Sequence, residues 1–155
     1  MAGWYNKVSK DLSHLPDCID HFDGELAYAR ANDLNLKGKP IERLSAEMPG
    51  IVEQRYNQLQ EIEAILEYMN AELRRIRSNY FRKYLENYNR ALTARDAEKY
   101  IDGESEVVDM AALINEFALL RNKWIGLHKG LETKNFQINN IVKLRAAGMD
   151  DATIM

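Results

Sequence analysis

A chain of 155 residues is long enough to bury one hydrophobic core and too short for several ordinary domains. Its formal net charge of −3, from 21 basic and 24 acidic residues, argues against general coating of duplex DNA but allows a local basic patch. The single cysteine, Cys18, excludes an internal disulfide, and no apolar run approaches the ~18 residues that a membrane span needs. The N-terminal segment lacks the apolar core of a signal peptide, so we expect a cytoplasmic protein without a membrane partner.

Residues 1–48 are predicted to form an N-terminal arm and a short helical region. Four apolar side chains could anchor the polar arm: Trp4, Tyr5, Leu12 and Leu15. Pro16 suits the first turn of a helix, which we expect to end near Asn32. Gly38 and Pro40 then indicate a loop before a short helical turn.

Residues 49–155 are predicted to form a core of long helices. We expect Pro49 to open the first of them, because the chain from Ile51 to Leu92 contains no glycine or proline and repeats apolar residues at helical steps. Such a rod is ~65 Å long. A globular chain of this size has a radius of gyration near ~15 Å. The rod must therefore project or pack against other subunits.

A short helix and a second long helix complete the predicted core. Thr93 is a plausible N-cap for a helix that reaches Tyr100, and Asp102 and Gly103 indicate a turn. From about residue 104 to 147 the pattern predicts a long amphipathic helix closed by Gly148. Within it, the GxxxG spacing at 126–130 is expected to let another helix approach closely. The sequence therefore predicts an all-α protein of elongated helices that suit a homo-oligomer.

Positive charge is concentrated between residues 74 and 95. This stretch carries +6, so the rest of the chain, whose total is −3, carries −9. Helical spacing places several of its cations opposite an apolar line that includes Tyr80 and Tyr84. Cations that follow phosphates and rings that stack on bases are typical of single-stranded nucleic-acid binding, although a solvated helix face beside core tyrosines gives a similar pattern. The candidate DNA-binding residues are Arg74, Arg75, Arg77, Tyr80, Phe81, Arg82, Lys83 and Arg90.

Catalytic motifs are absent from the sequence. His14, Cys18 and His21 have steps of four and three residues, which on one helix would bring them together as metal ligands. Pro16 leaves His14 outside the helix and no fourth ligand has suitable spacing, so a buried cysteine beside two ordinary histidines is the favoured interpretation. The chain also lacks a phosphate-binding glycine loop and a nucleophile elbow. We expect a protein that is not an enzyme and uses no metal or other cofactor.

The stretch from Arg75 to Phe81, RIRSNYF, resembles the DNA-contact motif of the phage recombination mediator UvsY family, found in T-even phages and their relatives. That motif has two basic residues one position apart, followed by an aromatic pair, and Arg75, Arg77, Tyr80 and Phe81 match it. A second likeness is a long helix with an aromatic residue followed by a Phe-x-Ile-x-x-Ile run that begins at Phe136. The resemblance covers roughly residues 50–148.

The resemblance implies a protein of the infected bacterial cytoplasm that binds single-stranded DNA. Such mediators form rings of about six or seven subunits. They help to load a RecA-like recombinase onto DNA coated by single-strand-binding protein. Their C-terminal helices drive assembly, and the matching residues are Phe117, Trp124, Leu127, Leu131, Phe136, Ile138 and Ile141. The alternative is a non-catalytic helical phage structural or host-interaction protein whose basic face binds an acidic protein partner.

Overall fold

The computed structural model describes residues 3–87 and 93–149, and every regular element in these ranges is helical. The predicted all-α class is therefore confirmed. The elements are α1 (Trp4–Lys10), the 3₁₀ turn η1 (Leu12–His14), α2 (Leu15–Tyr28), the π turn η2 (Ala29–Asp33), α3 (Ile41–Asn87), α4 (Ala94–Asp102) and α5 (Ser105–Ala146).

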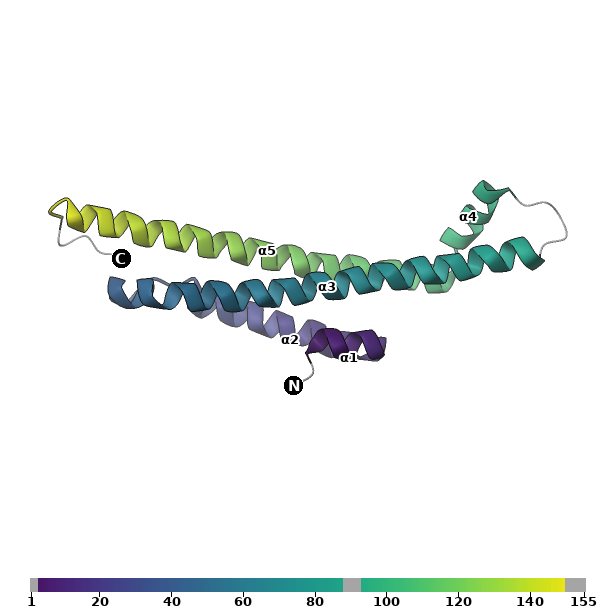
Figure 1. The fold of residues 1–155 in the computed structure, drawn as a ribbon, viewed down its shortest axis with the longest axis horizontal. Coiled ribbons are helices and arrows are strands. Elements are labelled where there is room, and N and C mark those ends of the chain that lie inside the picture. Colours follow the sequence, from purple (N-terminus) through teal and green to yellow (C-terminus); the bar gives the residue numbers. More distant parts are fainter. Residues whose placement is uncertain (1–2, 88–92, 150–155) are drawn as a thin grey trace.

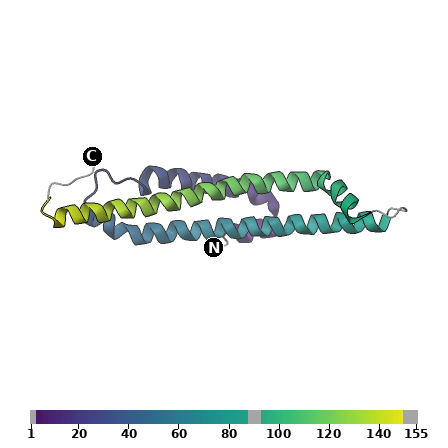
Figure 2. The same ribbon diagram turned by 90° about the horizontal axis from the view of Figure 1, so that it is seen from above.

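Two long antiparallel helices, α3 and α5, run side by side along the molecule (Figure 1). The 47 residues of α3 make a rod of ~70 Å. In a view rotated by 90°, α1 and α2 lie along the middle of this hairpin, and α4 lies at one end (Figure 2). A long central helix and a long C-terminal helix are both present, as the sequence predicts.

The main hydrophobic core lies where α1 and α2 pack against the hairpin. The ring of Phe22 meets the ring of Trp124 edge to face, with centroids 5.9 Å apart. The start of the chain, expected to form a polar arm, instead forms α1 and η1, and Val8 is fully buried. The Tyr68 hydroxyl donates to the Ser9 carbonyl oxygen at 3.0 Å and ties this segment to α3.

The N-terminal end of α3 differs from the expectation, because the helix begins at Ile41 and contains Pro49. A proline inside a helix removes one backbone hydrogen bond and crowds the preceding turn. Here a small second core offsets that cost, since Leu44 and Met48 pack with Ile138 of α5. Tertiary packing therefore extends the helix through a residue that by itself indicates a helix start.

Two buried cations hold η2 between the long helices. The Arg55 guanidinium, 3% exposed, donates to Asp33 at 2.7 Å and to Glu25 at 2.6 Å. The Lys134 ammonium, also buried, donates to the Asp33 carbonyl oxygen at 2.5 Å. Burial lowers the pKa of Lys134, and the nearby charge of Lys39 lowers it further. A lysine in the middle of α5 is thus an interior contact.

The helix ends follow the predicted signals. The Thr93 hydroxyl accepts from the Asp96 amide at 3.2 Å and caps α4, which continues to Asp102. At the end of α5, Gly148 has φ +93°, and the Met149 amide donates to the Leu144 carbonyl oxygen at 3.0 Å. That bond is the Schellman closure for which glycine is suited.

Candidate nucleic-acid interface

A hollow of about 360 Å³ with a mixed polar and apolar lining lies at the α4 end of the hairpin, between α3 and α5. Arg75, Asn79 and Lys83 line it from α3. Steps of four residues put these three side chains on one helical face. Two cations, an amide and the neighbouring Tyr80 thus come together in one concave surface, which we call the Arg75–Lys83 hollow.

Tyr80 forms the aromatic wall of this hollow. The Lys83 ammonium lies 5.9 Å from the centre of its ring, within the range of a cation–π contact. Partial burial, followed by the charges of Glu106 and Glu104, raises the pKa of the Tyr80 hydroxyl. A hydrogen bond to the Glu106 side chain contributes to the same shift.

Arg75 is held by an exposed ion pair on its own helix. Its guanidinium donates through Nη2 and Nε to Glu72, at 2.7 and 3.2 Å, which raises the pKa of Arg75. The Arg75 side chain remains 62% exposed. Its partner Glu72 is only 19% exposed, so the pair is open to solvent on the arginine side, from which a phosphate can approach the guanidinium.

Arg77 lies outside the hollow, on the side of α3 that faces α4. Its guanidinium donates to Asp102 at 2.7 Å and links the two helices. The structure therefore separates Arg75 and Arg77, the two basic residues that the sequence motif brings together. Phe81, the other member of the aromatic pair, is half-buried.

The remaining predicted contacts face solvent or fall outside the described ranges. Arg74 is exposed and lies 3.4 Å from the Glu67 carboxylate. Arg82 and Lys83 are exposed and have no ion pair with residues 3–87 or 93–149. Arg90 lies outside the residues that the structure describes.

The sequence reasoning missed the acidic residues that surround the basic face. Asp102 ends α4, Glu104 precedes α5 and Glu106 lies in the first turn of α5. Asp102 pairs with Arg77, and Glu104 accepts a hydrogen bond from the Tyr84 hydroxyl. Glu106 lines the hollow. The regular spacing of these acids could have been noticed, but only the fold places them opposite α3.

Most of the predicted assembly residues lie inside the protomer. Five of them are almost fully buried in the chain's own core: Phe117, Trp124, Leu127, Leu131 and Ile138. A side chain that is buried within one chain has no free surface for a second chain. Ile141 packs partly against the small core, whereas Phe136 is 69% exposed. Among the seven, Phe136 is therefore the side chain that fits an interface best.

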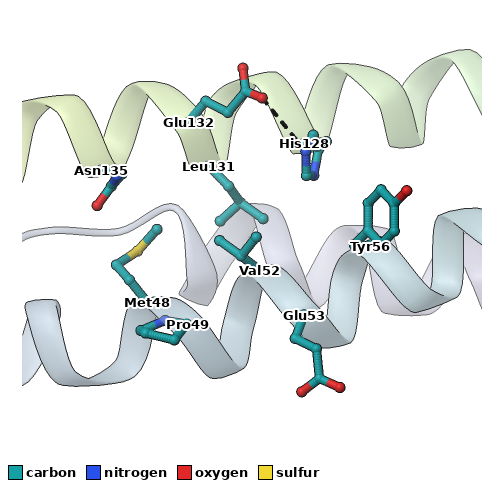
Figure 3. A pocket seen from close by; sticks show the side chains of 9 residues that line it. All are labelled: Met48, Pro49, Val52, Glu53, Tyr56, His128, Leu131, Glu132 and Asn135. Carbon is teal, nitrogen blue, oxygen red and sulfur yellow. Dashed lines mark ion pairs between the residues drawn. The ribbon is translucent and has the colours of Figure 1, made fainter.

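A second, apolar hollow of about 470 Å³ lies near Pro49 (Figure 3). The rings of Tyr56 on α3 and His128 on α5 lie next to each other, with centroids 5.8 Å apart. His128 Nδ1 is buried and has no hydrogen-bond partner among the described residues. Because Glu53 and Glu132 are the only charged side chains that line it, this hollow is unsuited to phosphate.

The residues of the metal hypothesis do not gather into a site. His14 lies in η1, outside α2, and His21 packs its ring between Trp4 and Phe22. Burial, with a smaller contribution from the charge of Glu61, raises the pKa of the Cys18 thiol to about 12. A thiol in that state is a poor ligand and a poor nucleophile at neutral pH. Across residues 3–87 and 93–149, no three or more His, Cys, Asp or Glu side chains lie close enough together to hold a metal ion.

Comparison with known proteins adds no relative: no family model, no curated protein and no solved structure matches the chain. In the described part of the chain, no helix has both the length and the apolar character to cross a bilayer.

Proposed function

We propose that this protein binds single-stranded DNA and acts as a recombination mediator without catalytic activity. The observation that carries the proposal is the grouping of Arg75, Asn79, Tyr80 and Lys83 in one open hollow on α3. Two of these residues, Arg75 and Tyr80, match the basic and aromatic positions of the stretch that resembles the DNA-contact motif of the UvsY family.

The chemistry of the Arg75–Lys83 hollow fits a nucleotide strand. Arg75 and Lys83 are eight residues apart, or ~12 Å along the helix, so they can hold separate phosphates of one strand. The Asn79 amide adds a donor between them, and Tyr80 adds an aromatic ring. Exposed Arg82 and Arg74 extend the positive surface beyond the hollow. A basic groove beside an aromatic ring is the usual arrangement for sequence-tolerant binding of a single strand.

The mediator role extends this binding to partners. A factor that loads a RecA-like recombinase must hold DNA while single-strand-binding protein is displaced. One protomer offers few cations, so its affinity for a strand is modest. A ring of protomers multiplies that affinity because each added basic face raises the effective concentration of the next.

Removal of two cations from the hollow tests the proposal. We expect Arg75→Ala with Lys83→Ala to weaken retardation of an unstructured oligonucleotide about tenfold and to flatten the log–log salt slope by ~1.4, or ~0.7 for each lost contact. The matched control is Arg43→Ala with Lys129→Ala. Arg43 is 63% exposed, pairs with a glutamate of the same helix and lies far from the hollow. Unchanged binding by the Arg75/Lys83 variant would reject the proposal.

A second candidate function has a specific observation in its favour. Arg74, Arg75 and Arg77 all pair with carboxylates of their own chain, so the basic face is able to accept an acidic protein surface. Under that alternative the wild-type protein fails to retard oligonucleotides at low salt. It would instead be captured by an acidic partner, and Arg75→Ala would weaken that capture.

A further inference from the structure

Acidic residues at the junction of α4 and α5 lie against the basic face of α3. The Asp102 carboxylate accepts from Arg77 at 2.7 Å. Glu106, four residues further along the chain, lines the hollow together with Arg75 and Lys83. A surface proposed to bind a polyanion thus carries two fixed negative charges next to its cations.

Helix stability does not account for the carboxylate of Asp102. It is the last residue of α4, where the negative end of the helix dipole disfavours an acid. Its side chain is 63% exposed, so its pair with Arg77 adds little to folding. Glu106 differs, because an acid in the first turn of α5 is favoured by the dipole. Asp102 is therefore the more informative of the two.

Fixed carboxylates beside a basic face affect duplex and single strands unequally. A duplex carries one phosphate charge for each ~1.7 Å of its axis, and its two strands keep a fixed separation. It cannot move its phosphates away from Glu106 while it contacts Arg75 and Lys83, nor away from Asp102 while it approaches Arg77. A single strand has a lower charge density and a flexible backbone, so it can pass around the carboxylates. The repulsion is therefore larger for the duplex.

We infer that Asp102 and Glu106 are specificity-determining residues that make the basic face of α3 select single-stranded over duplex DNA. The inference rests on the proposed DNA-binding function and assigns its strand preference to two side chains. Asp102 acts by occupying Arg77, and Glu106 acts by placing a negative charge inside the Arg75–Lys83 hollow.

Neutralising both carboxylates tests the inference. The variant Asp102→Asn with Glu106→Gln is compared with wild type for binding to an oligothymidine and to a duplex of equal length, at low and near-physiological salt. Each released cation adds ~0.9 to the salt slope for duplex and ~0.7 for a single strand. Affinity for both should rise, by about threefold to tenfold for the single strand, as expected for the loss of one exposed ion pair and one nearby negative charge. The ratio of duplex to single-strand Kd should fall about twofold.

Three control variants test whether the effect comes from the two carboxylate charges themselves, rather than from side-chain shape or from the net charge of the protein. Asp20→Asn with Glu42→Gln changes the net charge by the same amount at exposed positions away from the hollow, and it should leave the ratio unchanged. Asp102→Glu with Glu106→Asp keeps both charges and should keep the wild-type ratio. Asp102→Asn alone, at an exposed helix end, provides a variant that should fold even if the double variant does not.

The outcomes separate the two proposals. A fall in the ratio that appears only in the neutralised variants supports the inference. If wild type binds the single strand but neutralisation leaves the ratio unchanged, or if the charge-conserving variant shifts it equally, the inference is overturned and the DNA-binding function stands. If wild type binds neither oligonucleotide at low salt, the DNA-binding function itself is overturned.

Discussion

Arg55 shows how one buried side chain links three segments of the fold. Its guanidinium, on α3, donates to Glu25 of α2, to Asp33 of η2 and to Gln58 of its own helix. The Tyr28 ring centroid lies 5.9 Å from the guanidinium carbon. Removing a buried cation from its carboxylate partners strongly destabilises the fold, because the carboxylates are left unpaired.

We predict that Arg55→Ala lowers the free energy of unfolding by about 3–5 kcal/mol, measured by urea denaturation. The control, Arg43→Ala, removes an exposed pair with Glu47 and should change stability by less than ~0.5 kcal/mol. Equal effects of the two substitutions would contradict the buried role of Arg55.

The same pair predicts an acid dependence of stability. The hydrogen bond from Arg55 lowers the pKa of Glu25 in the folded protein below its ordinary value of 4.5. The unfolded chain therefore takes up a proton first as the pH falls, and the stability from this pair is lost below 4.5, towards the folded pKa. Urea midpoints from pH 7 downwards should fall less steeply in Arg55→Ala than in wild type. A parallel fall in both proteins would contradict the linkage.

At the scale of elements, the two glycines of the GxxxG spacing in α5 meet different surroundings. A Cβ added at Gly130 would lie 3.1 Å from Cδ2 of Leu34, in the segment after η2. A Cβ added at Gly126 would meet nothing within 4 Å. Close approach of another segment, expected for this spacing, therefore involves Gly130, and Gly126 has no such role within the protomer.

These surroundings predict that glycine-to-alanine substitution affects the free energy of unfolding differently at the two positions. Gly126→Ala should raise the free energy of unfolding by about 1 kcal/mol, the difference in helix propensity. Gly130→Ala gains the same propensity but must displace Leu34, so it should stabilise less or destabilise. Urea denaturation of the two variants side by side measures the difference. Equal stabilisation would show that Leu34 moves away without cost.

At the scale of the whole molecule, α5 has more apolar surface than its own chain covers. Exposed apolar residues occur along the helix, and they include Val108, Leu119, Phe136, Val142 and Leu144. Together with the length of the rod, such exposure favours association of copies. The buried residues first assigned to assembly build the protomer, so the remaining exposed side chains are the candidates for contacts between subunits.

We therefore predict an oligomer whose mass, by light scattering coupled to size exclusion, is a multiple of 17.9 kDa at micromolar concentration. Phe136→Ser should shift it towards monomer without loss of helix content, because it removes the most exposed of the large apolar side chains in the described residues. Leu85→Ser, at the far end of α3, is the control and should have a smaller effect. A wild-type monomer would reject the assembly proposal.

Features that depend on local interactions can be predicted from the amino-acid sequence alone. Helical periodicity predicted the two long helices, and the caps at Thr93 and Gly148 were read from single residues. These signals are reliable because a helix bonds each residue to neighbours four positions away and a cap acts within one turn. Clustering of cations on α3 was visible for the same reason, since residues four apart share a face.

Which helix faces meet depends on contacts between residues far apart in the chain. Packing of Met48 and Leu44 with Ile138 carries α3 through Pro49, against its local preference. The return of the chain through α4 pairs Asp102 with Arg77 and places Glu106 in the hollow. Such contacts join residues far apart in sequence, and periodicity identifies an apolar or basic face without naming its partner. The same limit explains why Trp124 was assigned to an interface and lies in the core.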